Sequence, residues 1–212
     1  EFDMYETVQP FNADNGYQEA GQYSDGELIQ GYGGGICQVT STLYMAVVKA
    51  ELKVTARSPH SYPASYVPKS YDAAIAGTYK NFKFVNTTDY PIYIEGITGG
   101  GKMTFTIYGC ETRPSNRTIT FESRVITTTP YEEPEETVDD TKPAGYRERV
   151  SSAHTGYYCE MWKHIFVDGV ETDSVRVNAS TYRMQNAKYI IGPEEPTTEA
   201  PTTEAPTTSP TT

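Results

Sequence analysis

The stretch from Gly33 to Tyr44 constrains the fold of this 212-residue chain more than any other. Its three consecutive glycines permit backbone geometries that residues with a Cβ resist, and they let another group approach closely. From Ile36 onward apolar residues recur with helical spacing, which predicts an amphipathic helix over about 36–51. Cys37 then lies in the first helical turn, where unpaired N–H groups and the helix dipole stabilise a thiolate.

Two interpretations of Cys37 remain open at this point. An activated cysteine fits the combination of a glycine turn and a helix start, because both favour the ionised thiol. A small buried residue at a tight turn fits as well, since free cysteine is among the most buried residue types.

The first half of the chain predicts an α+β domain over residues 1–112, with one main helix packed on an antiparallel sheet. Apolar and polar residues alternate at 81–86, 92–97 and 103–108, which predicts strands. Gly99–Lys102 joins the last two as a hairpin.

Three shorter segments complete the prediction for this domain. Asp25-Gly26 predicts a tight β-turn ahead of Leu28 and Ile29. Val54–Arg57 and Asp72–Ala76 are both interpreted as short strands.

The second half predicts an elongated all-β module over residues 113–192, because its alternating segments show no helical periodicity. Asp168-Gly169 is a strong hairpin signal within it. Residues 193–212 repeat Pro, Thr and Glu, a composition that cannot form a core and predicts a disordered, extended linker. Stalks of this kind usually lie outside the cell.

The net charge of −11 argues against a nucleic-acid partner and against docking on anionic lipid. The sequence has no apolar run near the roughly 18 residues that span a bilayer, and no visible signal peptide. Glu1–Tyr5 already reads like a strand, so we expect a fragment of a longer protein. The three cysteines lack metal-ligand spacing, and we expect neither a metal nor a cofactor.

Three blocks in order resemble the VanW family over about residues 1–110: a glycine-rich Cys-Gln block at 33–44, a His-Ser-Tyr-Pro block at 59–68 and an Asn-x-Thr-Asp-Tyr-Pro block at 86–94. VanW-like domains occur in Gram-positive surface proteins, and the name derives from a vancomycin-type glycopeptide-resistance gene cluster. The resemblance implies an extracellular, cell-wall or cell-surface location, and it implies no particular reaction.

The region of about 117–192 resembles G5 domains through Gly145–Val150, Val167–Glu171, Ser174–Tyr182 and Ile190–Gly192. G5 domains are thin β-ribbons associated with adhesins and cell-wall enzymes, and the resemblance implies binding to amino-sugar polymers.

A nucleophilic cysteine needs a base within hydrogen-bond reach and a third group that orients the base. His60 is the one histidine of the first domain and lies on a proline-rich loop, and Asp72 follows twelve residues later. The order Cys, His, acid recurs in papain-like and NlpC/P60-like peptidases, an analogy of layout alone. One hypothesis is therefore a peptidoglycan-modifying enzyme in which Cys37, His60 and Asp72 catalyse acyl transfer or hydrolysis, with backbone N–H groups as oxyanion donors. Ordinary structural roles for His60 and Asp72 remain the alternative.

The expected substrate-binding residues flank this site: Gly34, Gly35, Gln38, Ser41, Ser61, Tyr62 and Tyr66. A second hypothesis is a non-catalytic module that binds or adheres to peptidoglycan or another cell-wall glycan, for which the 18 tyrosines are suited. An internal thioester between the adjacent Cys37 and Gln38 would be badly strained. An enzyme needs Cys37 ionised beside His60, and a binder does not.

Cys110 and Cys159 have two interpretations. A disulfide between them would cross the domain boundary and fit an oxidising exterior. Alternatively, both are ordinary buried thiols.

Overall fold

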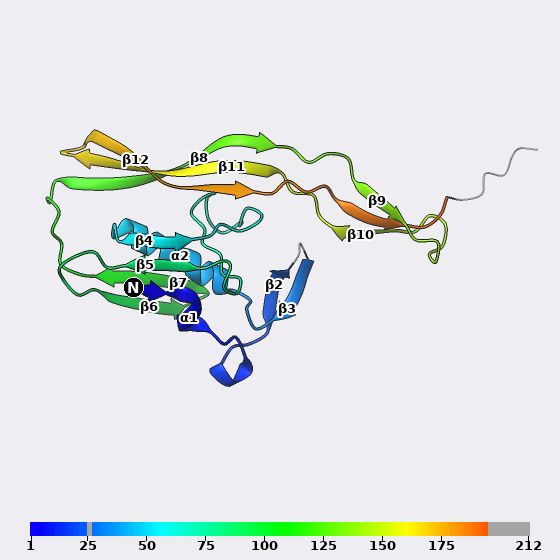
Figure 1. Cartoon of the computed structure of the whole chain (residues 1–212), viewed down its shortest axis with the longest axis horizontal. Helices are drawn as coiled ribbons and strands as arrows, with labels where there is room; N and C mark the ends of the chain where they lie inside the picture. The colour runs from blue at the N-terminus through cyan, green and yellow to red at the C-terminus, as the bar shows by residue number, and fades with distance from the viewer. Residues whose placement is uncertain (25–26, 195–212) are drawn as a thin grey trace, which may run out of the picture.

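The computed structural model describes residues 1–24 and 27–194, and within these ranges the chain is mostly β with two α-helices (Figure 1). The predicted turn at Asp25-Gly26 and most of the predicted linker, residues 195–212, lie outside the described residues. Neither described helix has the length and hydropathy that a bilayer crossing requires.

The elements in chain order are β1 (Phe2–Asp3), α1 (Met4–Val8), the 3-10 helix η1 (Ala13–Asn15), β2 (Ala20–Ser24), β3 (Glu27–Gly31), α2 (Ile36–Lys49), β4 (Lys53–Arg57), β5 (Phe82–Val85), β6 (Tyr93–Gly99), β7 (Lys102–Tyr108), β8 (Arg117–Thr129), β9 (Glu135–Val138), β10 (Arg147–Ser151), β11 (Gly156–Val167), β12 (Val170–Tyr182) and β13 (Lys188–Ile191).

Helix α2 is the centre of the first unit, and its start confirms the prediction from the glycine stretch. Gly35 precedes it with φ of 89°, a left-handed conformation that favours glycine. One face of the helix is buried, including Leu43, Tyr44 and Val47. The Tyr44 ring meets Phe82 of β5 edge-on, with centroids 5.5 Å apart.

The strands β1–β7 of the first unit form three small sheets. β1, β5 and β4 form an antiparallel sheet in the order β1-β5-β4, and β2 pairs with β3. β6 and β7 form the predicted hairpin, with Gly99 opposite Lys102. Ile94, Phe105 and Ile107 of this hairpin pack against the core.

The predicted strand at Asp72–Ala76 is wrong, because this segment pairs with side chains and a loop in place of a neighbouring strand. The Ala73 N–H donates to Ser41 Oγ at 2.9 Å, and the Ile75 N–H donates to Cys37 Sγ at 3.5 Å. The Ala74 N–H donates to the Ser58 carbonyl at 2.8 Å. Polar side chains of α2 therefore satisfy backbone groups that a ladder would otherwise use.

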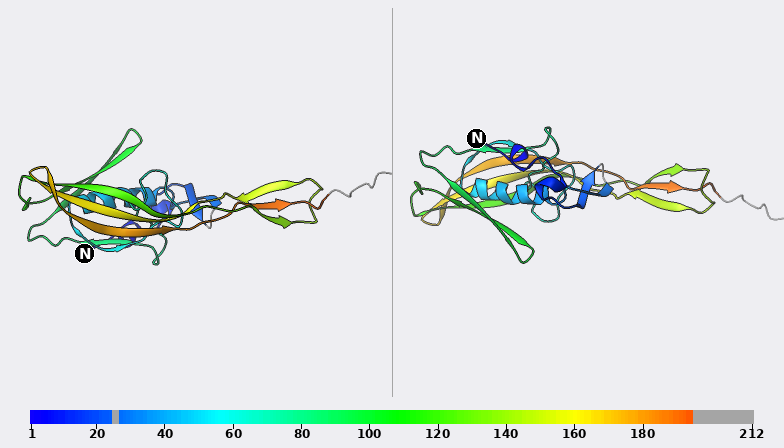
Figure 2. Two further views of the ribbon diagram at one scale, coloured as in Figure 1. Left: turned by 90° about the horizontal axis from the view of Figure 1, so that it is seen from above. Right: turned by 90° about the horizontal axis from the view of Figure 1, so that it is seen from below.

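The second unit consists of strands alone in its described part, as its alternating pattern predicts. β8, β11 and β12 form an antiparallel sheet in the order β12-β11-β8, and a sheet of shorter strands in the order β10-β13-β9 extends beyond it (Figure 2). Asp168 and Gly169 have φ of 52° and 78°, so the predicted hairpin between β11 and β12 is confirmed with positive φ at both turn positions.

The sheet β12-β11-β8 lies along the first unit and shares its core (Figure 1). Met161 of β11 is fully buried in the same cluster as the α2 side chains, and Phe121 and Val177 pack against it. The boundary at 112/113 stays a prediction, and hydrophobic packing continues across it.

Candidate active site

Cys37 lies in the first turn of α2, directly after the glycine turn, and is partly exposed. Its sulfur accepts from the Ile75 N–H at 3.5 Å and lies 3.6 Å from the Ile75 carbonyl oxygen. The N–H groups of Ile36 and Gln38 donate to Gly33 and Gly35. In the described part of the chain the Cys37 N–H has no such acceptor outside the helix, as is usual for the N–H groups of a first helical turn.

Gly34 is required because β2 approaches it closely. A Cβ on Gly34 would lie 2.5 Å from the Ala20 Cβ and 2.8 Å from the Ala20 carbonyl carbon. Since one of these contacts is backbone, it cannot be relieved by a side-chain rotation. The glycine turn therefore allows β2 to pack against the segment that leads into Cys37.

His60 is held by Asp72 through two contacts. Nδ1 of the ring lies 2.7 Å from Asp72 Oδ2, and the His60 backbone N–H donates to the same oxygen at 2.7 Å. These contacts fix both the ring and the loop that carries it. Nε2 lies on the opposite side of the ring, 3.3 Å from the Tyr66 hydroxyl.

Asp72 is buried, with a side-chain exposure of 1%. Its Oδ1 accepts from Arg57 Nη2 at 2.8 Å and from the Tyr182 hydroxyl at 2.6 Å. Burial raises the pKa of Asp72, but the hydrogen bonds and charges of His60, Arg57 and Tyr182 outweigh it and lower the pKa to about 2. The carboxylate is therefore ionised at neutral pH.

Cys37 and His60 shift each other's pKa in opposite directions. Burial raises the pKa of the Cys37 thiol, but hydrogen bonding with His60 and the Ile75 backbone, together with the charges of His60 and Lys80, lowers it below its usual value. Burial lowers the pKa of His60, but hydrogen bonding with Asp72 and Cys37 and their charges raises it to about 9. The two groups therefore favour a thiolate–imidazolium pair at neutral pH.

The structure thus brings together all three residues for which sequence analysis predicts catalytic roles. Cys37 comes from α2, His60 from the loop after β4, and Asp72 from the extended segment that follows. A thiolate, a histidine beside it and a carboxylate that orients the histidine are the parts of a cysteine nucleophile site.

The predicted substrate-binding residues divide into two groups. Gly35, Gln38 and Tyr66 are exposed near Cys37 and His60, and Gly34 lies just before them. Ser41 is fully buried and donates to the carbonyls of Cys37 at 2.8 Å and Ala73 at 3.2 Å.

Ser61 and Tyr62 are engaged by other parts of the chain. Ser61 Oγ accepts from Lys80 Nζ at 3.1 Å. The Tyr62 hydroxyl donates to Gln185 Oε1, and its ring stacks on His154 with centroids 4.3 Å apart. Tyr62 therefore contacts the second unit, whereas the sequence predicts that it binds substrate.

Sequence analysis missed Arg57, Lys80, Ser180 and Tyr182. Arg57 ends the predicted strand 54–57, and only its position before the His60 loop could have drawn attention to it. Tyr182 is 110 residues from Asp72, so no local pattern links the two.

Cys110 and Cys159 are free thiols in the structure, so the predicted bridge between them is not formed. Cys110 is exposed after β7, whereas Cys159 is fully buried in β11 opposite Ser180 and Val125. Burial raises the pKa of the Cys159 thiol, which keeps it protonated.

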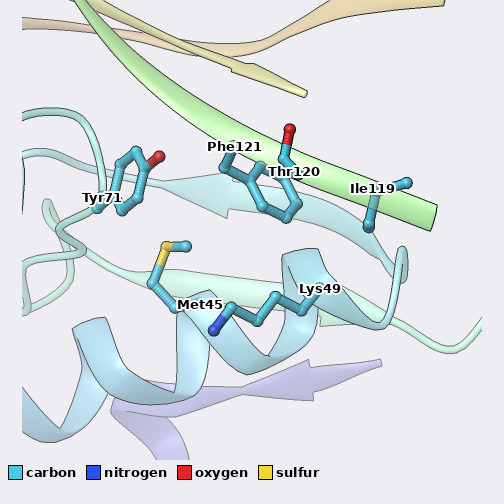
Figure 3. Close-up of a pocket in the computed structure, with 6 residues that line it drawn as sticks. All are labelled: Met45, Lys49, Tyr71, Ile119, Thr120 and Phe121. Atoms are coloured by element: carbon cyan, nitrogen blue, oxygen red, sulfur yellow. The ribbon is translucent and has the colours of Figure 1, made fainter. Parts of the chain in front are cut away.

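A groove of about 590 Å³ lies between α2 and β8, and Figure 3 shows Met45 and Lys49 of the helix on one side of it and Phe121 and Ile119 of β8 on the other. Tyr71 closes one end. Cys37, His60 and Asp72 do not line this groove, so it is separate from the site.

Comparison with known proteins gives one family and a small set of relatives. The family model described as VanW like protein matches residues 1–108. The uncharacterized protein YoaR of Bacillus subtilis (strain 168) is 37% identical over 110 residues, which are 52% of this chain and 36% of that protein. The chain therefore spans about a third of the length of this curated relative.

Two solved structures are similar to this chain. The IgA1 protease G5 domain structure has 15% identity and a TM-score of 0.28, and covers 37% of this chain and 94% of its own. The crystal structure of HP0197-G5 has 18% identity and a TM-score of 0.20, and covers 35% of this chain and 99% of its own. TM-scores this low support no functional argument.

Proposed function

This chain belongs to the VanW family, and we propose that it is a cell-envelope protein whose Cys37, His60 and Asp72 form a thiol acyl-transfer site for peptidoglycan peptides. The observation that carries the proposal is the contact of His60 Nδ1 with the buried Asp72 carboxylate at 2.7 Å, and the pKa of Cys37, lowered by His60, supports it. The extracellular setting and the peptidoglycan substrate come from the family resemblance.

The first step of the reaction is attack by the Cys37 thiolate on the carbonyl carbon of a peptide bond. The carbonyl π electrons move to oxygen, and the backbone N–H of Cys37 donates to the resulting oxyanion. His60 then gives its Nε2 proton to the leaving amine, the C–N bond breaks, and a thioester on Cys37 remains.

The second step uses the same groups in reverse. Neutral His60 takes a proton from a water or from an acceptor amine, whose lone pair attacks the thioester carbonyl. The C–S bond breaks, Cys37 leaves as a thiolate, and His60 is again an imidazolium. Throughout, Asp72 holds Nδ1–H at 2.7 Å and fixes the orientation of the ring.

The test is incubation of the full chain with muropeptides, followed by mass spectrometry of both peptide and protein. We expect cleaved or exchanged peptides and a mass adduct on Cys37, both lost in Cys37→Ala. Cys110→Ala is the matched control, because that thiol is exposed and distant in sequence from the site. A folded chain whose peptide and protein masses stay unchanged over a panel of muropeptides would contradict the proposal.

A second function, glycan binding without turnover, is favoured by the exposed tyrosines of the β6–β7 hairpin. Tyr93 and Tyr108 are 64% and 51% exposed, and their rings stack with centroids 6.0 Å apart. The Tyr108 hydroxyl donates to Glu95 at 3.1 Å. Aromatic faces beside polar groups suit sugar rings.

Co-sedimentation with purified cell-wall sacculi tests this second function. Tyr93→Ala is expected to reduce the bound fraction severalfold, whereas Tyr131→Ala, which removes a tyrosine 53% exposed in the second unit, is expected to leave it unchanged. Equal binding by both variants would contradict a role for the hairpin.

A further inference from the structure

We propose that Tyr182, together with Ser180, positions the Asp72 carboxylate of the first unit from strand β12 of the second, so that the site is complete only with β12 docked. The inference deepens the proposed function and rests on it in taking Cys37 as the reacting group. Both residues lie outside the matched VanW region, which ends at residue 108.

Alternate residues of β12 face the first unit. Asn178 Nδ2 donates to the Tyr44 hydroxyl at 2.5 Å and to the Ser70 carbonyl at 3.0 Å. Ser180 Oγ accepts from Arg57 Nη1 at 2.7 Å. The strand period of two brings Tyr182 to the same face.

The Tyr182 hydroxyl both donates and accepts a hydrogen bond. It donates to Asp72 Oδ1 at 2.6 Å and accepts from the Ser70 N–H at 2.7 Å. Tyr182 is 2% exposed, and burial together with the Asp72 charge raises its pKa, so the hydroxyl stays protonated and remains a donor.

The two oxygens of Asp72 therefore have separate partners. Oδ1 accepts from Arg57 and Tyr182, and Oδ2 accepts from the ring and backbone of His60. With both Oδ1 partners present, the carboxylate plane is fixed and Oδ2 faces His60 Nδ1. Without the tyrosine hydroxyl, Arg57 alone holds Oδ1, and a buried hydrogen bond to a charged group is lost.

Ser180 supports Asp72 indirectly, through Arg57. Its hydroxyl holds the Arg57 guanidinium, whose Nε also donates to the Asp72 carbonyl at 2.6 Å. The side chains of β12 thus support Asp72 both directly and through Arg57.

The other charged and titratable groups that face Asp72 and His60 come from four elements or loops: Arg57 of β4, Cys37 and Tyr44 of α2, Tyr66 and Lys80 of the loops, and Cys159 of β11. Tyr182→Phe substitutes none of these groups and leaves the Arg57 contact with Ser180 in place, so a shift in Cys37 ionisation in that variant reports the loss of the Tyr182 contact.

The test is the alkylation rate of Cys37 in the full chain from about pH 5 to about pH 10, read by mass spectrometry of the Cys37 peptide. We expect Tyr182→Phe to reduce the rate roughly fivefold to tenfold at pH values below the wild-type titration midpoint, which is a rise of up to about one unit in the apparent pKa. The rate at high pH, where every thiol is ionised, should stay unchanged. Tyr146→Phe is the matched control, because that hydroxyl contacts Glu148 in the second unit.

Two results would contradict the positioning role of Tyr182. A Tyr182→Phe profile that matches the wild type overturns it, and so does a faster reaction at all pH values, which would indicate loosening of the fold. If Tyr182→Phe does not fold, Ser180→Ala replaces it, with a smaller shift expected in the same direction and an unchanged profile as the contradiction.

The failure of this inference differs from the failure of the proposed function. An ordinary thiol titration in the wild type would contradict the catalytic site itself. A lowered pKa of Cys37 in the wild type that persists in Tyr182→Phe would leave the site intact and remove only the role of β12.

Discussion

At the residue scale, Asp72 is the group on which the candidate site depends. It is buried from water, and it accepts from Arg57, Tyr182 and the ring and backbone of His60. A buried carboxylate is stable only when its lone pairs are satisfied and its charge is compensated. Because Arg57 and His60 supply both, Asp72 can remain ionised where a lone carboxyl would not.

The acid dependence of stability tests this account of Asp72. Its pKa falls from 3.8 to about 2 in the folded chain, so its contribution is present above about pH 4 and lost as the pH falls through about 2. That shift corresponds to about 2 kcal/mol. We expect the free energy of unfolding of the wild type to fall more steeply over this range than that of Asp72→Asn.

Urea denaturation at a series of pH values measures this difference. Asp89→Asn, at an exposed position, is the control and should reproduce the slope of the wild type. Parallel slopes for the wild type and Asp72→Asn would show that the ion pair does not stabilise the fold.

At the element scale, the hydrogen bonds between α2 and the segment Asp72–Ala76 position the site, and we call this contact the joint. The start of α2 could be predicted because its signals are local: three glycines and an apolar repeat within the same stretch. The pairing of Asp72–Ala76 could not, because its short apolar run resembles a strand while its partners are the side chains of Ser41 and Cys37. Side-chain pairing of this kind leaves no periodic trace in a sequence.

Removal of the Ser41 hydroxyl tests this joint. Ser41→Ala leaves the buried Ala73 N–H without its acceptor, so we expect a loss of about 1–3 kcal/mol in the free energy of unfolding. Thr42→Ala on the same helix is the control, because Thr42 bonds only the Gln38 carbonyl one turn earlier, and a loss below about 0.5 kcal/mol is expected. Similar losses in the two variants would contradict the joint.

At the scale of the whole molecule, the two units are tied by a shared core and by Glu51. This carboxylate accepts from Arg113 at 2.7 Å, Arg117 at 2.6 Å and Lys163 at 2.6 Å, and so connects the end of α2 to the segment between β7 and β8, to β8 and to β11. The hydrogen bond from Arg117 and those from Lys163 and Arg113 hold its pKa far below the usual value despite partial burial.

Neutralisation of Glu51 is expected to loosen the contact between the units. Glu51→Gln leaves three cations facing one another, and we expect a loss of roughly 1–3 kcal/mol in the free energy of unfolding together with faster proteolysis near Arg113. Glu135→Gln removes a carboxylate from one exposed pair with Lys188 and should have little effect. An unchanged rate of proteolysis in Glu51→Gln would contradict the role of Glu51 in holding the two units together.

The predicted catalytic residues come together because they lie within one segment of 36 residues, where the order Cys, His, acid follows the chain. The sequence also predicts an all-β second unit, from alternation alone. It does not predict that β12 reaches Asp72, because a contact over 110 residues depends on how two sheets pack and not on either local pattern.

The central claim is that Cys37 and His60 form an ion pair, and the rate of Cys37 alkylation against pH in the wild type and in His60→Ala tests it most directly. Peptide mass spectrometry separates Cys37 from Cys110 and Cys159, so no further substitution is needed. We predict that the wild-type thiol titrates well below the ordinary value of about 8.5 and that His60→Ala returns it to that value or above, because burial then acts without the imidazolium. A thiol that titrates normally in both proteins would contradict the account.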